Sequence, residues 1–146
     1  MAVARQYTSS LIDTRYGQHL EQVSVSAMIK GKQLLICAIY IPPDRSQDLN
    51  VIEEHIATVQ ELSSIGNEVL VCGDYNQPRM HWIRSDTGIV CNDTLLPAAS
   101  QSLLDGMEFS NLEQRNLAYN RLGCTLDLVF CQHECESIVV RCSIQK

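Results

Sequence analysis

The stretch Val69-Leu70-Val71-Cys72-Gly73-Asp74-Tyr75-Asn76 decides the fold of this chain. Its first half is a run of β-branched and small apolar residues, which is typical of a strand covered on both faces. Gly73 allows the backbone to bend tightly, and Asp74 and Asn76 then lie on the same side of the chain where the strand ends. A carboxylate beside an amide suits a site for a hard divalent cation and a phosphate or water oxygen. An Asx-turn, in which both side chains only bind loop backbone, explains the same residues equally well.

Polar residues also stand at the ends of two other apolar segments. The segment 33–41 predicts a strand that stops at Pro42-Pro43, because proline cannot donate to a strand ladder, and Tyr40 lies near its end. Asp127 stands inside the apolar run 124–131, where a carboxylate is costly unless it is paired or hydrogen-bonded. From residue type alone, the simpler interpretation of Tyr40 is a strand-end tyrosine with a solvated hydroxyl. Asp127 is likewise explained as a cap on neighbouring backbone.

Taken together, the three strand ends have the order and rough spacing found in the endonuclease/exonuclease/phosphatase superfamily, which the chain resembles from near Met1 to about Phe130. Within the superfamily, it is most similar to the endonuclease domain of non-LTR retrotransposon polyproteins. This closer resemblance lies in Asn76-Gln77-Pro78, Trp82, Leu103-Leu104-Asp105, the stretch 111–116 and Leu126-Asp127-Leu128. The resemblance implies an α/β (α+β) fold, namely a partial two-sheet β-sandwich flanked by helices, as in deoxyribonuclease I-like folds.

The resemblance also implies a reaction, which is divalent-metal-dependent phosphodiester hydrolysis with DNA as the partner. Asp74 would serve the attacking water or the metal, and Asn76 would hold the phosphate, so both are candidate ligands of Mg²⁺ or Mn²⁺. Tyr40 would help to organise the transition state. Asp127 would orient a catalytic histidine, as the acid of a catalytic triad does.

Other parts of the family pattern have no counterpart in this sequence. We find no first-strand Asn, no metal-binding Glu before Tyr40 and no final Ser-Asp-His motif, and His55 and His81 are interpreted as surface residues. We therefore expect a domain truncated at both ends, a metal that is bound weakly if at all, and activity that is weakened or lost. The alternatives are an inactive fragment or interaction module and, less favoured, a small-molecule phosphoesterase. Missing strands would leave sheet edges uncovered, which predicts self-association.

Three further residues are candidates for substrate contact. Arg45 follows Pro42-Pro43 and is positioned to meet a phosphate backbone, whereas Arg79 is better explained as a solvated surface charge. Trp82 is a candidate for stacking on a base, although packing of the loop is the favoured interpretation.

The whole chain has the size and composition of one globular domain, residues 1–146. It has 146 residues, 45% of them hydrophobic and 19% charged. The net charge of −6 and the pI near 5.1 argue against a stand-alone tight binder of nucleic acid, but not against an enzyme that meets DNA through a local patch. No segment resembles a membrane span or a signal peptide, so the nucleus or the cytoplasm is the expected location.

The seven cysteines are interpreted as reduced thiols packed among apolar residues. A zinc site built from Cys131, His133, Cys135 and Cys142 is disfavoured, because the spacing lacks a paired C-x₂-C knuckle.

Periodicity predicts the remaining elements. Strands are expected at 1–5, 20–29, 33–41, 68–72, 111–114, 124–131 and 137–142, with a hairpin turn at Lys30-Gly31-Lys32. A helix capped by Ser46 or Asp44 should end at Gly66, with Leu49, Ile52, Ile56, Val59 and Leu62 on its apolar side. A long loop is expected from Asp74 to about Asp93, followed by a helical stretch within 94–107.

Overall fold

The computed structural model describes residues 8–17, 20–65 and 68–132. In chain order the elements are β1 (Ser9–Ile12), β2 (Glu21–Ile29), β3 (Lys32–Tyr40), α1 (Leu49–Ser64), β4 (Glu68–Asp74), β5 (Trp82–Ser85), β6 (Gly88–Cys91), α2 (Ala98–Phe109), β7 (Glu113–Gln114) and β8 (Asp127–Cys131). The strands predicted at 1–5 and 137–142, the helix end at Gly66 and three members of the disfavoured zinc set (His133, Cys135 and Cys142) lie outside the described residues.

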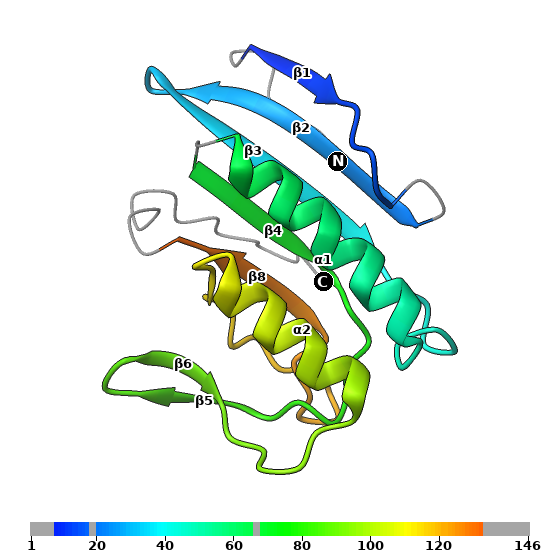
Figure 1. Cartoon of the computed structure of the whole chain (residues 1–146). Helices are drawn as coiled ribbons and strands as arrows, with labels where there is room; N and C mark the ends of the chain where they lie inside the picture. Colours follow the sequence, from blue (N-terminus) through cyan, green and yellow to red (C-terminus); the bar gives the residue numbers. More distant parts are fainter. Residues whose placement is uncertain (1–7, 18–19, 66–67, 133–146) are drawn as a thin grey trace.

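The main sheet is mixed and has the strand order β1-β2-β3-β4-β8-β7 (Figure 1). The β3–β4 pair is parallel, and α1 makes the crossover between these two strands. All other pairs in this sheet are antiparallel. β5 and β6 form a separate two-stranded antiparallel sheet. Antiparallel hairpins combined with a helical crossover give the α+β class that the sequence predicted.

The hairpin between β2 and β3 is confirmed at its predicted turn. Lys30 has φ 51° and Gly31 has φ 79°, so both central residues are left-handed, as a type I′ turn requires. Ile29 and Lys32 then stand opposite each other, and the register continues along the whole of β2 and β3.

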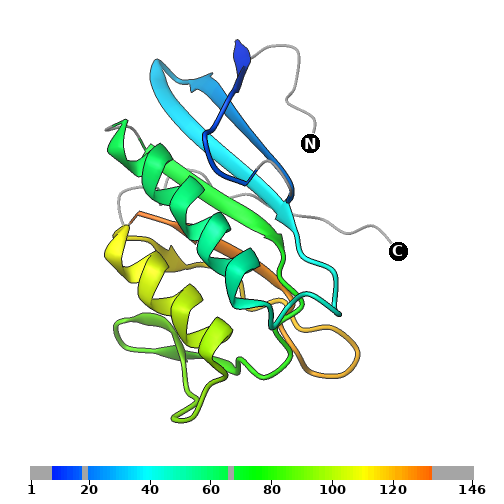
Figure 2. The same ribbon diagram turned by 45° about the vertical axis from the view of Figure 1, so that its right-hand side comes forward.

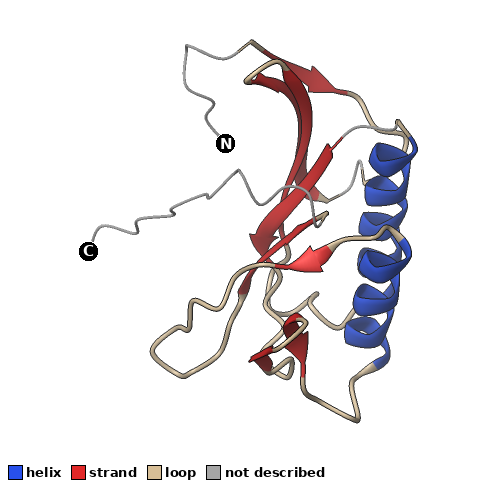
Figure 3. Ribbon diagram, turned by 90° about the vertical axis from the view of Figure 1, so that its left-hand side faces the viewer, coloured by secondary structure: helices blue, strands red, loops and turns tan. Residues whose placement is uncertain are grey.

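Both helices cover the same face of the sheet (Figure 3). Alternate residues of β3 and β4 point toward the helices, because successive side chains of a strand face opposite sides. The core formed there includes Leu35, Cys37, Ile39, Val69 and Val71 from the sheet, and Ile52, Val59, Leu62, Leu103 and Met107 from the helices. Gly106 allows α2 to approach α1 closely, since a Cβ at this position would lie 2.7 Å from the Ile56 side chain.

The opposite face of the sheet is apolar; Leu34 and Cys131 are buried on it, and other apolar residues on it are partly buried. It presents Ile36 and Ala38 from β3, Leu70 and Cys72 from β4, and Val129 from β8. The strand ends that carry the candidate site continue this face, so the site lies on the side of the sheet away from the helices.

The predicted cap of α1 is wrong. The N-cap residue is Asp48, whose side chain accepts from the backbone N–H of Asn50 at 3.0 Å. The Ser46 hydroxyl is instead used in the preceding turn, where it donates to the Pro43 carbonyl. The backbone N–H of Arg45 also bonds to Pro42, so the segment after the prolines forms turns before the helix begins.

Two other predictions need correction. The loop predicted from Asp74 to Asp93 contains the β5–β6 hairpin, whose short strands were too weakly patterned to recognise. Gly73 is required for close approach rather than for a bend, because a Cβ there would lie 1.9 Å from the Ile39 carbonyl oxygen on β3. In the described ranges, no helix is both long and apolar enough to cross a membrane.

Candidate functional site

The candidate site is built on three neighbouring strand ends. Tyr40 at the end of β3 stands beside Asp74 at the end of β4, and Asp74 stands opposite Asp127 at the start of β8. Residues in register on adjacent strands point to the same face of a sheet, so the three side chains form one row. The loops after β3 and β4 and the loop before β8 gather at this same end of the sheet (Figure 2). The sequence predicted these residues as a group, and the register brings them together.

The turn after β4 orients Asp74 and Asn76. Asp74 Oδ1 accepts from the backbone N–H of Asn76 at 3.2 Å, which is the Asx-turn considered from the sequence. Asn76 has φ 48°, a left-handed conformation that asparagine tolerates better than most residues. Its amide nitrogen donates to the Ile41 carbonyl at 2.9 Å, which points the amide at the end of β3. The turn therefore fixes the position of both side chains, and one Asp74 oxygen and the Asn76 amide oxygen are not used in these bonds.

Asp127 lies at the exposed rim of the sheet, not inside a buried strand. Partial desolvation, and then the negative charge of Asp74 opposite it, raises the pKa of the Asp127 carboxyl above its ordinary value. The Asn116 side chain donates to the Asp127 backbone carbonyl and holds the start of β8. Two carboxylates face each other across the strand pair, which concentrates negative charge where oxygen ligands for a cation are available.

The donor set at the rim is of the type that Mg²⁺ prefers. The ion usually takes one or two protein carboxylates and keeps several waters, and Asp74 and Asp127 with the Asn76 amide oxygen offer this chemistry. Among residues 8–17, 20–65 and 68–132, no group of three or more His, Cys, Asp or Glu side chains is arranged to hold a metal. The described residues thus fit a hydrated, loosely held divalent ion rather than a closed metal cage.

Three arginines lie on the loops connected to the row of strand ends. Arg45, Arg79 and Arg121 are all exposed, and they lie on the loops after β3, after β4 and before β8, respectively. Arg45 also meets Asp48 at 4.0 Å, a distance at which an exposed pair contributes little. Arg121 was missed from the sequence because nothing there places its loop beside the other two.

Tyr40 and Trp82 differ sharply in exposure. Tyr40 is 42% exposed at the rim. Trp82 is only 4% exposed, and its ring packs edge-on against Phe130 at a centroid distance of 6.1 Å. Trp82 therefore packs the loop, as the sequence favoured, and its buried ring leaves no open face for a base.

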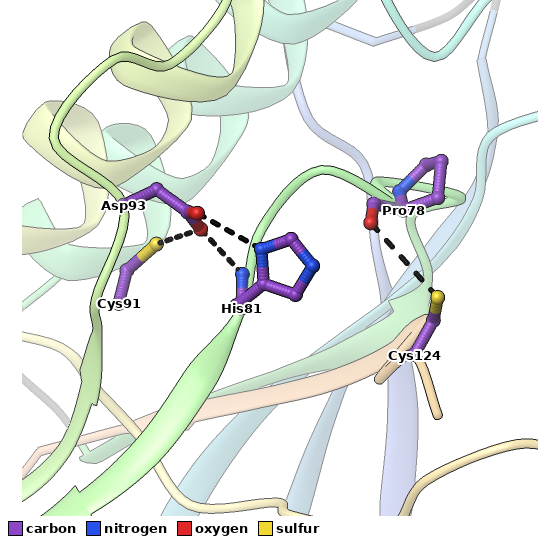
Figure 4. Close-up of polar contacts among 5 residues, drawn as sticks. All are labelled: Pro78, His81, Cys91, Asp93 and Cys124. Atoms are coloured by element: carbon purple, nitrogen blue, oxygen red, sulfur yellow. Dashed lines mark hydrogen bonds and ion pairs between the residues drawn. The ribbon is translucent and has the colours of Figure 1, made fainter. Parts of the chain in front are cut away.

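His81 has a partner that the sequence did not reveal. Its backbone N–H and its ring Nδ1 both meet the Asp93 carboxylate, at 2.6 and 2.8 Å, and the Cys91 thiol points at the same carboxylate (Figure 4). The backbone N–H of His81, followed by its ring, holds the pKa of Asp93 below its ordinary value. The ring itself is exposed, as predicted. These bonds join the two ends of the β5–β6 hairpin.

His55, Tyr75 and Gln77 were missed as members of the site region. The prediction that His55 lies on the surface is wrong, since its side chain is completely buried. Helical spacing contained the signal: His55 is three residues after Ile52 and four before Val59, on the buried side of α1. The polar residue type outweighed this spacing in the sequence interpretation. Tyr75 and Gln77 are also completely buried and alternate with Asp74 and Asn76.

Comparison with known proteins identifies the fold. No protein-family model matches the chain, and no match was found among curated proteins. Among solved structures, the chain is similar to the endonuclease domain of TRAS1, a telomere-specific non-LTR retrotransposon, with a TM-score of 0.60 and 14% identity over 90% of this chain. It is also similar to an AP endonuclease from Archaeoglobus fulgidus (TM-score 0.49, 15% identity, 85% of this chain and 59% of that chain) and to the human Nocturnin catalytic domain (TM-score 0.47, 14% identity, 86% and 48%).

The fold is that of the deoxyribonuclease I-like endonuclease/exonuclease/phosphatase proteins, as the sequence resemblance implied. The chain spans 58% of the length of the TRAS1 endonuclease domain that it matches. The predicted α+β class and the predicted deoxyribonuclease I-like fold are both confirmed.

Proposed function

We propose that this chain carries part of the phosphate-handling centre of a metal-dependent DNA endonuclease of the non-LTR retrotransposon type. The observation that supports the proposal most directly is the row Tyr40–Asp74–Asp127, aligned by strand register on one face at one end of the sheet. Phosphodiester hydrolysis requires a group to take a proton from water and positive charge to offset the phosphate. In this proposal Asp74 takes the proton or binds the ion, and Asn76 holds a phosphate oxygen.

The placement of arginines supports contact with a polyanionic substrate at this end of the molecule. Arg45, Arg79 and Arg121 stand on the loops around the strand ends, together with the acidic Asp44, Asp48, Asp74 and Asp127. In contrast, α1 and α2 contain no Lys or Arg and carry Glu53, Glu54, Glu61, Asp105 and Glu108. Because phosphate contacts dominate DNA affinity, DNA would meet the rim rather than the helical layer. The overall net charge of −6 is then compatible with a local contact.

A divalent ion would be held by Asp74 and Asn76, with Asp127 opposite. When bound, it would offset negative charge on the phosphate. Because so few protein oxygens are offered, we expect weak binding and a requirement for a high ion concentration.

Lost catalysis is the second candidate, because no third acidic ligand joins Asp74 and Asp127 within the described residues. Nicking of supercoiled plasmid in Mg²⁺ or Mn²⁺ separates the two functions. Nicking that disappears in Asp74→Ala and in EDTA supports the endonuclease. A wild-type chain that leaves the plasmid intact, or nicking that persists in Asp74→Ala, supports an inactive module with this fold.

A further inference from the structure

A chain of hydrogen bonds runs through the core directly behind the candidate site. The Tyr75 hydroxyl lies 2.8 Å from His55 Nε2, and His55 Nδ1 lies 3.0 Å from Gln22 Oε1. Gln22 Nε2 donates to Thr58 Oγ1 at 2.9 Å, and the Thr58 hydroxyl donates to the Glu54 carbonyl. The chain therefore links the site turn to α1 and β2, and it ends on the backbone of α1.

The Glu54 carbonyl at the end of the chain fixes which group donates in every other bond. A backbone carbonyl only accepts, so the Thr58 hydroxyl must donate to Glu54 and accept from the Gln22 amide nitrogen. The Gln22 amide oxygen then faces His55, whose Nδ1 must carry the proton. His55 Nε2 is consequently a bare acceptor, and the Tyr75 hydroxyl donates to it. Only a neutral imidazole with its proton on Nδ1 satisfies all of these groups.

Burial enforces the neutral state of this ring. His55 is 0% exposed, and desolvation lowers its pKa from 6.5 to about 3. The groups that face it are the Tyr75 hydroxyl and the Gln22 amide, neither of which carries charge. Gly17 encloses the network, because a Cβ at Gly17 would collide with Gln22 Nε2 and crowd Thr58.

Tyr75 lies between Asp74 and Asn76 in the sequence, and its ring points into the core against His55 and Phe130. Its backbone N–H donates to the Leu126 carbonyl next to Asp127, and the Asp74 carbonyl accepts from the Ile41 N–H. The bond from the Tyr75 hydroxyl to His55 therefore ties the backbone segment that carries Asp74 and Asn76 to α1. An apolar residue in place of His55 would fill the same space without the cost of burying two ring nitrogens.

We infer that His55 is a positioning residue: through its bond to Tyr75 it fixes the backbone that carries Asp74 and Asn76. The consequence for catalysis rests on the proposed function, whereas the order of the turn can be measured without any activity. His55 itself does not touch the substrate.

The test compares Tyr75→Phe with the double variant His55→Leu/Tyr75→Phe in the full chain. Tyr75→Phe leaves His55 Nε2 buried without a donor, which lowers stability. The double variant removes both polar partners of that bond, so the bond stays absent without a buried unpaired Nε2, while Gln22 Oε1 loses its His55 donor. The two roles of His55, space filling and positioning, then predict different results for the double variant.

Hydrogen exchange of the Ile41 and Asn76 amides reports the order of the turn. Positioning by His55 predicts that both amides exchange about tenfold faster in both variants, relative to core amides, which is the effect of one lost buried hydrogen bond. If DNA is nicked, kcat falls in both variants while KM for the plasmid stays constant. Exchange that returns to the wild-type rate in the double variant overturns the inference.

Val69→Ala is the matched control, since it removes buried volume at the other end of β4, about 16 Å from Asp74. It should lower stability and leave the relative exchange of the two turn amides unchanged; equal acceleration there also overturns the inference. Nitrogen NMR of the wild-type ring must find Nε2 unprotonated at neutral pH, and a protonated Nε2 contradicts the bond directions. If the chain nicks no DNA, the proposed function is refuted, and the exchange and NMR results still decide the role of His55.

Discussion

Asp74 and Asn76 face the rim of the sheet, whereas Tyr75 and Gln77, which alternate with them, are completely buried. The outward pair makes few bonds within the protein and retains oxygens that can bind a ligand. The polar groups of the inward pair form hydrogen bonds within the protein. One short segment thus places accessible and buried side chains on alternate residues, since the backbone turns successive side chains to opposite sides.

Both polar atoms of the buried Gln77 amide are hydrogen-bonded within the protein. Its amide nitrogen donates to the Ser46 carbonyl, and its amide oxygen accepts from Gln47 at 2.8 Å and from the Ser100 hydroxyl at 2.7 Å. It joins the loop after β3, the loop after β4 and α2. Because a buried polar group without a partner is costly, these bonds select one arrangement of the loops.

The outward side is tested most sharply by Asp74→Asn. The new amide oxygen still accepts from the Asn76 N–H, so the turn and the free energy of unfolding should be preserved within about 1 kcal/mol. If Asp74 takes a proton or binds an ion, nicking should nevertheless fall by about 10²–10⁴-fold. Plasmid nicking and urea denaturation measure the two effects separately. Glu53→Gln, an exposed change on α1, is the control that leaves both unaltered.

On the inward side, Tyr75→Ala should have the largest effect on stability. It empties the space between His55 and Phe130, which both contact the Tyr75 ring, so we expect a loss of about 3–5 kcal/mol. Urea denaturation gives the value. Tyr119→Ala, at a residue that is 57% exposed and whose hydroxyl donates to the Trp82 carbonyl, should cost about 1 kcal/mol. Similar losses in the two variants would contradict the division into inward and outward residues.

Gln77→Leu sharpens the comparison with a smaller change. Leucine fills the space but leaves the Ser46 carbonyl and the Ser100 hydroxyl without a partner, so about 1–3 kcal/mol should be lost. Chemical denaturation is again the measurement. Gln101→Leu removes an exposed bond to Asp105 on α2 and should stay within about 0.5 kcal/mol. A Gln77→Leu protein as stable as wild type would refute the role of these bonds.

The smallest predicted effect is a dependence of stability on pH. The folded-state pKa of His55 is lowered to about 3 from 6.5, so between these values the unfolded chain binds one more proton than the folded chain. Stability from this group is therefore complete above pH 6.5 and is lost as the pH falls toward 3. From pH 6 to pH 5 the loss should be about 1 kcal/mol. Denaturation of His55→Leu at the same two pH values should lack this component, and an identical slope would assign it to other groups.

Local patterns were sufficient for much of the fold and for the outward half of the site. The hairpin turn at Lys30-Gly31, the strand that stops at Pro42 and the apolar strand before Asp74 all follow from backbone preferences and alternation within a few residues. Tyr40, Asp74 and Asp127 were identified because polar residues end apolar segments in a recognisable order. The turn and the two strands are signalled within one segment each, and the site residues by the order of three such segments.

The inward half depended on contacts between distant segments. Gln77 bonds to residues 31 and 23 positions away, and Tyr75 bonds to His55 across 20 positions. The polar type of His55 predicts a surface residue until Gln22 and Tyr75 are known to face its two nitrogens.

The amino-acid sequence by itself determined the β2–β3 hairpin, the strand before Asp74 and the outward residues of the candidate site, because these depend on local backbone geometry and periodicity. Tertiary structure alone decided that Asp127 faces Asp74 and that His55 stands behind the turn. The reason is physical: the free energy of burying a polar group depends on partners that only the folded chain brings within hydrogen-bonding distance.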